Sequence, residues 1–115
     1  MADTHLDFDV LSALQEVMED EYPMLLDTFL ADAEERLVLL HKADDAQQLM
    51  NAAHSFKGSS SNMGAIRLAR LCHELEQCAK QKRLAGVEQL VGEIDSEFAL
   101  VRPLYEAERQ RALAD

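Results

Sequence analysis

The sequence contains few of the residues that build β-sheets or cross-link small secreted domains. Tryptophan is absent, aromatic residues make up 5% of the chain, and 115 residues include only two cysteines, two prolines and four glycines. Leucine, alanine, glutamate and glutamine are abundant instead, and these residues favour helices over strands. A chain of this length can bury one core without disulfides or metal. The composition therefore predicts a single all-α domain over residues 1–115.

Long apolar runs and a secretory leader are also missing. No apolar run reaches the roughly 18 residues of a membrane span, and Met1 to His5 lack the positive start and apolar middle of a signal peptide. We expect a cytoplasmic protein that does not bind membranes. Cys72 and Cys78 lie on one predicted helix, about 9 Å apart along its axis, which is too far for a disulfide. We expect both to be reduced, with Cys72 in the core.

Basic residues are scarce except in one segment. The chain has 11 Lys and Arg against 22 Asp and Glu, a formal net charge of −11, yet residues 54–83 carry six basic and two acidic side chains. The overall charge repels phosphate backbones, so we expect no nucleic-acid binding. The basic segment could steer an acidic partner, or its side chains could simply solvate a helix face. The side chains with this second interpretation are Arg67, Arg70, Lys80, Lys82 and Arg83.

Apolar residues recur at helical spacing in five segments. Asp7 or Asp9 can cap a short first helix that ends near Asp20. Tyr22-Pro23 then opens a helix to about Lys42, with proline in the first turn, where its missing N–H is not needed. Residues 1–6 are expected to fray.

Three more helices follow. Asp44 or Asp45 caps the third, which ends where Asn62 to Gly64 turns the chain. The fourth starts at about Ile66 and the fifth at about Val87, and Pro103 is expected to kink or end the fifth. Residues from about 110 to 115 are expected to fray. The pattern predicts an antiparallel up-down four-helix bundle, with the first helix packed across one end.

The most informative stretch is HSFKGSSSNMGA, residues 54–65. Positions i+3 and i+4 share a helix face with position i, so Lys57 places a cation beside any group attached to His54. Gly58 leaves the neighbouring spot without a side chain. Because glycine costs a helix roughly 1 kcal/mol against alanine, Gly58 is better explained as clearance for a partner. A neutral imidazole is a nucleophile near pH 7, so His54 is predicted to accept a phosphoryl group.

This pattern resembles the signature of the histidine-containing phosphotransfer (Hpt) domain, His-x-x-Lys-Gly-Ser-Ser-x-x-hydrophobic-Gly, followed by a helix with Leu and Cys. The matching residues are His54, Lys57, Gly58, Ser59, Ser60, Met63, Gly64, Leu68, Leu71, Cys72, Leu75 and Glu76. The chain is similar to the stand-alone bacterial form of the family. The resemblance implies a phosphorelay intermediate that takes a phosphoryl group from a receiver-domain phospho-aspartate and passes it to the aspartate of a response regulator.

The resemblance also implies what the chain itself does not supply. It implies no cofactor of its own, with Mg²⁺ provided by the receiver's acidic pocket during transfer. Its partners would be receiver domains of hybrid sensor kinases and response regulators, and it would act as a monomer. The sequence has no G-x-x-x-x-G-K-[ST] motif and no glycine-rich kinase loop. We therefore expect no ATP-dependent kinase activity.

Candidate partner contacts surround His54. Phe8, Leu11 and Asn51 are proposed as part of an apolar and small-residue docking patch, although ordinary core packing is an equal alternative for Phe8 and Leu11. Ser61 shares the helix face of His54.

Two residues of the fourth helix match family positions that flank the histidine and often carry Gln and Arg. These are Glu76 and Lys80. Glutamate departs from that pattern, which puts a phosphate-stabilising role of Glu76 in doubt and leaves Lys80 as a candidate.

Other chemistry-bearing residues have simpler interpretations. His5 and His41 are expected to be incidental. His73 and Glu76 could bind metal, but a metal site in a bundle needs complementary ligands on facing helices, and no such set is visible. Residues 59–61 are serines without triad partners, so we expect them to pack between helices and bond carbonyls of the preceding turn. A non-catalytic acidic helical adaptor and a metal-binding bundle remain the alternative functions.

Overall fold

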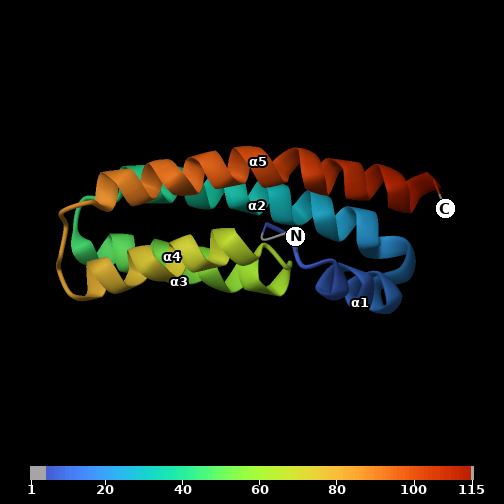
Figure 1. The fold of residues 1–115 in the computed structure, drawn as a ribbon, viewed down its shortest axis with the longest axis horizontal. Coiled ribbons are helices and arrows are strands. Elements are labelled where there is room, and N and C mark those ends of the chain that lie inside the picture. The colour runs from blue at the N-terminus through green and yellow to red at the C-terminus, as the bar shows by residue number, and fades with distance from the viewer. Residues whose placement is uncertain (1–4, 115) are drawn as a thin grey trace.

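The computed structural model describes residues 5–114 and shows five α-helices, which confirms the predicted all-α class (Figure 1). A single 3₁₀ turn, Glu19–Glu21, joins the first two helices. The helices are α1 (Phe8–Met18), α2 (Tyr22–Lys42), α3 (Ala46–Asn62), α4 (Ile66–Lys80) and α5 (Val87–Ala114).

The helix starts follow from their capping residues. Asp7 caps α1, where its carboxylate accepts hydrogen bonds from the backbone N–H groups of Asp9 and Val10. Asp45 caps α3 by accepting from Gln48 N at 2.8 Å. Pro23 occupies the first turn of α2, as predicted. Each cap satisfies donors that have no partner inside the helix.

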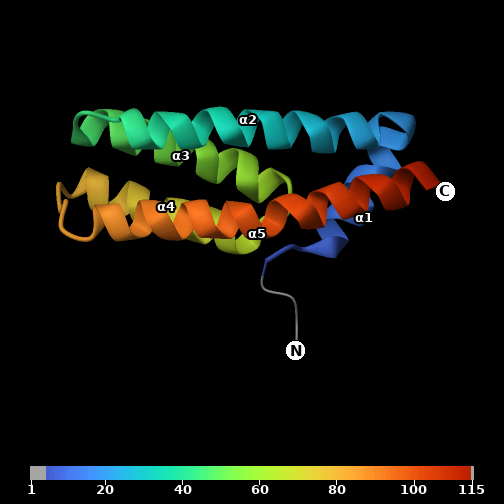
Figure 2. The same ribbon diagram turned by 90° about the horizontal axis from the view of Figure 1, so that it is seen from above.

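The helices form two layers that differ in the length of their helices. Helices α2 and α5 lie side by side in one layer, and the α3–α4 hairpin lies in the other (Figures 1 and 2). At about 1.5 Å per residue, the 28 residues of α5 are far longer than the 17 of α3. Helix α1 lies beyond the end of the hairpin, beneath the parts of α2 and α5 that extend past it. It therefore continues the hairpin layer instead of crossing the bundle end.

The core consists of one apolar stripe from each long helix, spaced three or four residues apart. Cys72 lies in it, as predicted, and burial raises the pKa of its thiol to about 12. The stripes comprise Leu26, Phe29, Leu30, Ala33 and Leu40 of α2, Leu49, Ala53 and Phe56 of α3, Leu68, Leu71, Cys72, Leu75 and Ala79 of α4, and Val91, Ile94, Phe98, Val101 and Tyr105 of α5.

Both described ends are more ordered than the sequence indicated. Leu6 is buried, and the carbonyl of His5 accepts a hydrogen bond from Ile66 N at 3.1 Å. Helix α5 runs through Pro103 to Ala114. Of the kink or end expected at Pro103, the end was therefore wrong, and the helix includes residues 110–114, where fraying is expected. Pro103 and Ala99, the residue one turn earlier, are both exposed. Water can therefore solvate the carbonyl that a proline leaves without its helical donor. Residues 1–4 and 115 lie outside the described part.

Two long-range hydrogen bonds join α5 to the start of α2 and to the turn after α3. Tyr22 Oη donates to Glu108 Oε2 at 2.7 Å, which joins the start of α2 to α5. Tyr105 Oη donates to the Met63 carbonyl at 2.6 Å, at the turn between α3 and α4. Burial raises the pKa of both phenols, so they remain protonated donors.

Gly64 completes the α3–α4 turn. Its φ of +73° is a conformation that side chains disfavour, and a Cβ there would lie 3.0 Å from the Asp7 carbonyl oxygen. The Gly64 carbonyl accepts from Asp7 N at 2.8 Å. The turn that sets the register of α3 against α4 is thus held by the segment before α1 and by Tyr105.

Candidate functional site

His54 lies on the outward face of α3, as the helical spacing predicted. Its side chain is 68% exposed, whereas Ala53 and Phe56 on the opposite face are fully buried. The Asp45 cap and the Gly64 turn fix the two ends of this helix. The histidine therefore projects to solvent from a well-anchored element.

Glu76 of α4 bridges His54 and Lys57 of α3. Its Oε2 lies 2.7 Å from His54 Nδ1, and its Oε1 lies 2.7 Å from Lys57 Nζ. The Lys57 contact is a close ion pair and not a well-aligned hydrogen bond. The Glu76 side chain is only 13% exposed, so this carboxylate is held in place beneath the exposed imidazole.

The protonation of Glu76 determines which ring nitrogen of His54 is available. The pKa of the Glu76 carboxyl is lowered by Lys57 first and by His54 as well, while partial burial acts in the opposite direction. An ionised carboxylate can only accept hydrogen bonds, so Nδ1 of His54 must carry the hydrogen. In the neutral ring, Nε2 then holds the lone pair. Nε2 makes no hydrogen bond with any residue from 5 to 114.

Gly58 leaves open space one turn beyond His54. A Cβ built on Gly58 would meet nothing within 4 Å. The fold itself therefore does not require glycine here, in contrast to Gly64. Open space beside a nucleophile supports the interpretation of Gly58 as clearance for a second macromolecule.

Comparison with known proteins agrees with this geometry. The family model described as the Hpt domain matches residues 24–104. The chain belongs to the Hpt domain family. Its structure matches the crystal structure of histidine-containing phosphotransfer protein B (HptB) from Pseudomonas aeruginosa PAO1 with a TM-score of 0.92 and 56% identity, over 96% of this chain and 98% of that one.

A plant protein shares part of this Hpt domain. Histidine-containing phosphotransfer protein 2 of Arabidopsis thaliana is 31% identical over 58 residues. The match spans 50% of this chain and 37% of the plant protein. It supports the family assignment and leaves most of the plant relative without a counterpart.

The structure separates the predicted docking residues of the Hpt domain. Leu11 is 1% exposed and belongs to the core, so the core-packing alternative holds for Leu11 and its assignment to the docking patch was wrong. It is buried because α2 and α5 extend over α1. Phe8 is 48% exposed, and Asn51, Ser61 and Lys80 are exposed. These four stay candidates for partner contact.

Two histidines expected to be incidental have defined partners. His5 Nδ1 lies 2.7 Å from Oε2 of the buried Glu97, whose Oε1 lies 3.4 Å from Arg67 Nε. His41 Nε2 lies 2.8 Å from Asp95 Oδ2. Both pairs link helices or termini far apart in sequence, so sequence spacing could not reveal them. They tie the Hpt domain together at positions away from α3.

The serines after Gly58 divide into two kinds. Ser59 Oγ donates to the Phe56 carbonyl at 3.2 Å, as predicted for a hydroxyl facing the preceding turn. Ser60 Oγ is fully buried without a hydrogen-bond partner in the described residues, so the same expectation was wrong for Ser60. Its small side chain lets α3 and α4 approach closely.

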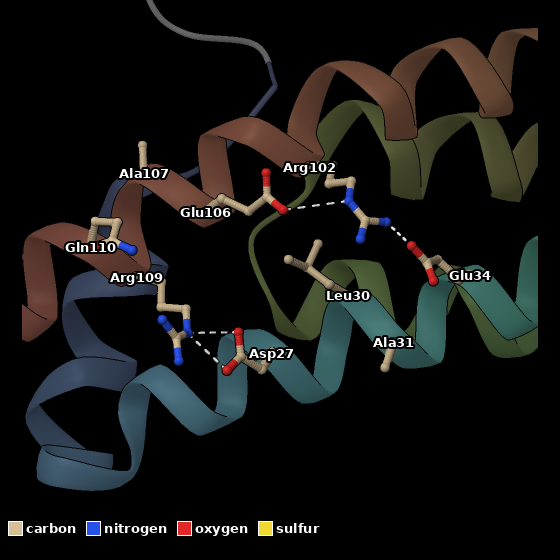
Figure 3. A pocket seen from close by; sticks show the side chains of 9 residues that line it. All are labelled: Asp27, Leu30, Ala31, Glu34, Arg102, Glu106, Ala107, Arg109 and Gln110. Carbon is tan, nitrogen blue, oxygen red and sulfur yellow. Dashed lines mark hydrogen bonds and ion pairs between the residues drawn. The ribbon is translucent and has the colours of Figure 1, made fainter.

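A separate surface groove of about 590 Å³ lies between α2 and α5 (Figure 3). Its charged residues are already paired: Arg109 Nε lies 2.8 Å from Asp27 Oδ1, and Arg102 bonds Glu34. None of its lining residues belongs to α3 or α4. This groove is therefore not part of the His54 site.

Within residues 5–114, no group of three or more His, Cys, Asp or Glu side chains is arranged to hold a metal ion. His73 is exposed, and among residues 5–114 Glu76 forms its contacts with His54 and Lys57 and not with His73. In the same range, no helix combines the length and the apolarity that crossing a membrane requires.

Proposed function

We propose that this Hpt domain is a phosphorelay intermediate whose His54 accepts a phosphoryl group from a receiver-domain phospho-aspartate and passes it to the aspartate of a response regulator. One observation carries the proposal: the anionic Glu76 engages His54 Nδ1 and leaves Nε2 as the exposed nucleophile. Lys57 and the open space at Gly58 lie on the same face.

The step is an in-line displacement at phosphorus. The lone pair of His54 Nε2 forms the N–P bond while the bond from phosphorus to the aspartyl oxygen breaks, and its electrons leave with the receiver's carboxylate. The ring keeps its Nδ1 hydrogen, so the phosphorylated imidazole carries a positive charge that Glu76 Oε2, 2.7 Å away, offsets. Passing the group onward reverses the same events.

Charge on the transferred group also needs stabilisation, because phosphoryl transfer depends on positioning and electrostatics more than on covalent help. Lys57 Nζ lies 2.7 Å from Oε1 of Glu76, the carboxylate that also holds His54. A phosphoryl dianion on Nε2 would compete with Glu76 for this ammonium. We assign the Mg²⁺ that supports transfer to the receiver's acidic pocket.

The proposed partners are receiver domains, and the proposal includes neither ATP-dependent kinase activity nor a resident cofactor. The chain would act as a monomer that meets one receiver at a time, because one exposed nucleophile serves both donor and acceptor.

Incubation with a phosphorylated receiver domain tests the proposal. Wild type should gain phosphate that is acid-labile and alkali-stable, and His54→Gln should gain none while keeping its thermal stability. His41→Gln is a matched control, because His41 is also an exposed imidazole held by a carboxylate. It should be phosphorylated like wild type.

Two outcomes would overturn the assignment. Equal phosphorylation of His54→Gln and wild type, or phosphate recovered on His73, would place the chemistry elsewhere. Tight receiver binding without phosphate transfer to wild type would instead favour a non-catalytic adaptor.

A further inference from the structure

A shallow groove of about 390 Å³ lies between α3, α4 and the start of α1. It lies next to the His54 site and is distinct from the groove in Figure 3. The side chains and backbone that line it are Asp7, Val10, Lys57, Ser61, Gly64, Ile66, Ala69, Arg70 and His73.

Lys57 connects this groove to the phosphorylation site. Its Nζ contacts Glu76, which holds His54, and the same side chain forms one wall of the groove. His73 lies one turn before Glu76 on α4. A partner that covers Nε2 of His54 therefore meets this end of the groove as well.

The groove combines an apolar floor with a basic rim. Val10, Ile66 and Ala69 are half-buried. Arg70 on the rim is exposed and makes no ion pair with any other residue from 5 to 114. Asp7 is the acidic group of the lining, and its carboxylate already accepts two backbone hydrogen bonds as the cap of α1.

An unpaired arginine is notable on a chain with a net charge of −11. Five of the seven arginines have carboxylate partners, namely Arg36, Arg67, Arg102, Arg109 and Arg111. Arg70 and Arg83 make no ion pair with any residue from 5 to 114, and of these two only Arg70 lines the groove. Arg70 thus presents an uncompensated charge beside the nucleophile, where an acidic partner surface would gain electrostatic attraction.

We propose that this groove is the docking surface for the receiver domain and that Arg70 is a specificity-determining residue, which favours receivers with an acidic and apolar segment beside the phosphorylated aspartate. The inference rests on the proposed function. A receiver fits because its phosphoryl-bearing pocket must reach within about 3–3.5 Å of Nε2, and a pocket that binds Mg²⁺ is built from carboxylates. The net charge of the chain disfavours a nucleic acid as the occupant.

The test uses a receiver domain chosen as the fastest phosphodonor from a panel encoded in the same genome. Transfer is measured as a function of receiver concentration for wild type, Arg70→Glu and Arg70→Ala. Arg83→Glu is the matched control, since Arg83 is an exposed arginine outside the groove lining.

We expect Arg70→Glu to raise the half-saturating receiver concentration by about tenfold, and Arg70→Ala by less, because rim charges act mainly on association. The rate constant at saturation should stay within about twofold of wild type, since Arg70 does not contact His54. The difference should shrink as salt is raised from about 0.05 to 0.5 M. Arg83→Glu should match wild type.

Different results would overturn the proposed phosphotransfer function and the assignment of the groove. No transfer to wild type would overturn the proposed function. Normal transfer to wild type together with identical saturation curves for Arg70→Glu and Arg83→Glu would overturn only the groove. An Arg70→Glu variant that converts a dimer to a monomer without altering receiver saturation would identify the groove as a contact between copies of this chain and would also overturn it. Thermal melts of each variant establish that the fold is kept.

Discussion

Glu76 Oε2 on α4 lies 2.7 Å from His54 Nδ1 on α3, and the other oxygen of the same carboxylate lies 2.7 Å from Lys57 Nζ. One side chain therefore orients the imidazole and positions the cation. A carboxylate that accepts from one ring nitrogen fixes the tautomer and leaves the other nitrogen free for chemistry. The glutamate that departs from the family pattern is thus integrated into the site.

Removing Glu76 should slow transfer. Glu76→Ala loses the charged hydrogen bond to Nδ1, and such bonds contribute about 1.5–3 kcal/mol. Because the site is open to water on one side, we expect the lower end, a decrease of roughly tenfold in the single-turnover rate constant. Glu76→Gln keeps an acceptor for Nδ1 and should be intermediate. Glu74→Ala, on the exposed face of the same helix, is the control. If Glu76→Ala matched Glu74→Ala, the orienting role would be refuted.

Lys57→Ala should affect the reaction more than receiver binding, which is the reverse of the pattern expected for Arg70. The Lys57 ammonium lies beside the phosphoryl site, so its loss removes charge stabilisation of the transferring group. We expect a decrease of about tenfold or more in the rate constant at saturating receiver, corresponding to roughly 1.4 kcal/mol. An unchanged rate constant would show that Lys57 serves only as surface charge.

Gly58→Ala should raise stability and lower transfer. Alanine gains roughly 1 kcal/mol of helix propensity, and its Cβ meets no atom within 4 Å in this fold. The methyl projects into the space that the receiver must enter, where a misplacement of about 1 Å can cost on the order of a hundredfold in rate. Gly58→Gln should hinder transfer further.

Gly92 supplies the matched control for Gly58. It lies inside α5 with the same open space around a built Cβ, so Gly92→Ala should also raise the melting temperature. It should leave transfer unchanged. Equal transfer by Gly58→Gln and wild type would contradict the clearance role.

Gly64→Ala should have the opposite effect on stability. A positive φ and a Cβ 3.0 Å from the Asp7 carbonyl oxygen both oppose a side chain. We expect a loss of about 1–3 kcal/mol in the free energy of unfolding, measured by urea titration. A variant as stable as wild type would show that the turn can rearrange.

Acid should weaken the link between α2 and α5. Arg111 chiefly, and Tyr22 as well, hold the pKa of the Glu108 carboxyl below its ordinary value. A lowered native pKa stabilises the fold above the unfolded value of about 4.3, and this contribution disappears as the pH falls through the native value.

Glu108→Gln should therefore lose less stability than wild type between pH 7 and pH 3. Chemical unfolding at both pH values measures this difference. Glu88→Gln, a change at an exposed position of the same helix, controls for the loss of one negative charge. Parallel pH dependence of Glu108→Gln and wild type would argue against the assignment.

Local signals predicted most of the fold. Asp45 and Pro23 marked helix starts, and apolar spacing marked the buried faces, because both depend on residues within a few positions of one another. Pro103 predicted a kink or an end and did not decide between them, because its effect on a helix depends on whether the affected carbonyl meets water, which the local sequence does not reveal.

The histidine motif was likewise predictable, because His54, Lys57 and Gly58 lie within one helical turn and a half. The role of Glu76 was not, since its contact with His54 joins positions 22 residues apart on different helices. The choice between docking and core packing for Leu11 was left open, because it depends on how far α2 and α5 extend beyond the hairpin. Contacts between helices require the rotation and register of each element.

Because the turn at Met63 and Gly64 is anchored, we expect this chain to lose little conformational entropy when a receiver binds. Tyr105 Oη and Asp7 N donate to the carbonyls of Met63 and Gly64, and the His5 carbonyl accepts from Ile66 N directly after the turn. We therefore expect the hairpin to keep its helix register when a partner binds. The phosphoryl acceptor then needs little ordering when a receiver arrives. Successive receivers would meet the same rigid template, and any adjustment of shape during an encounter would fall to them.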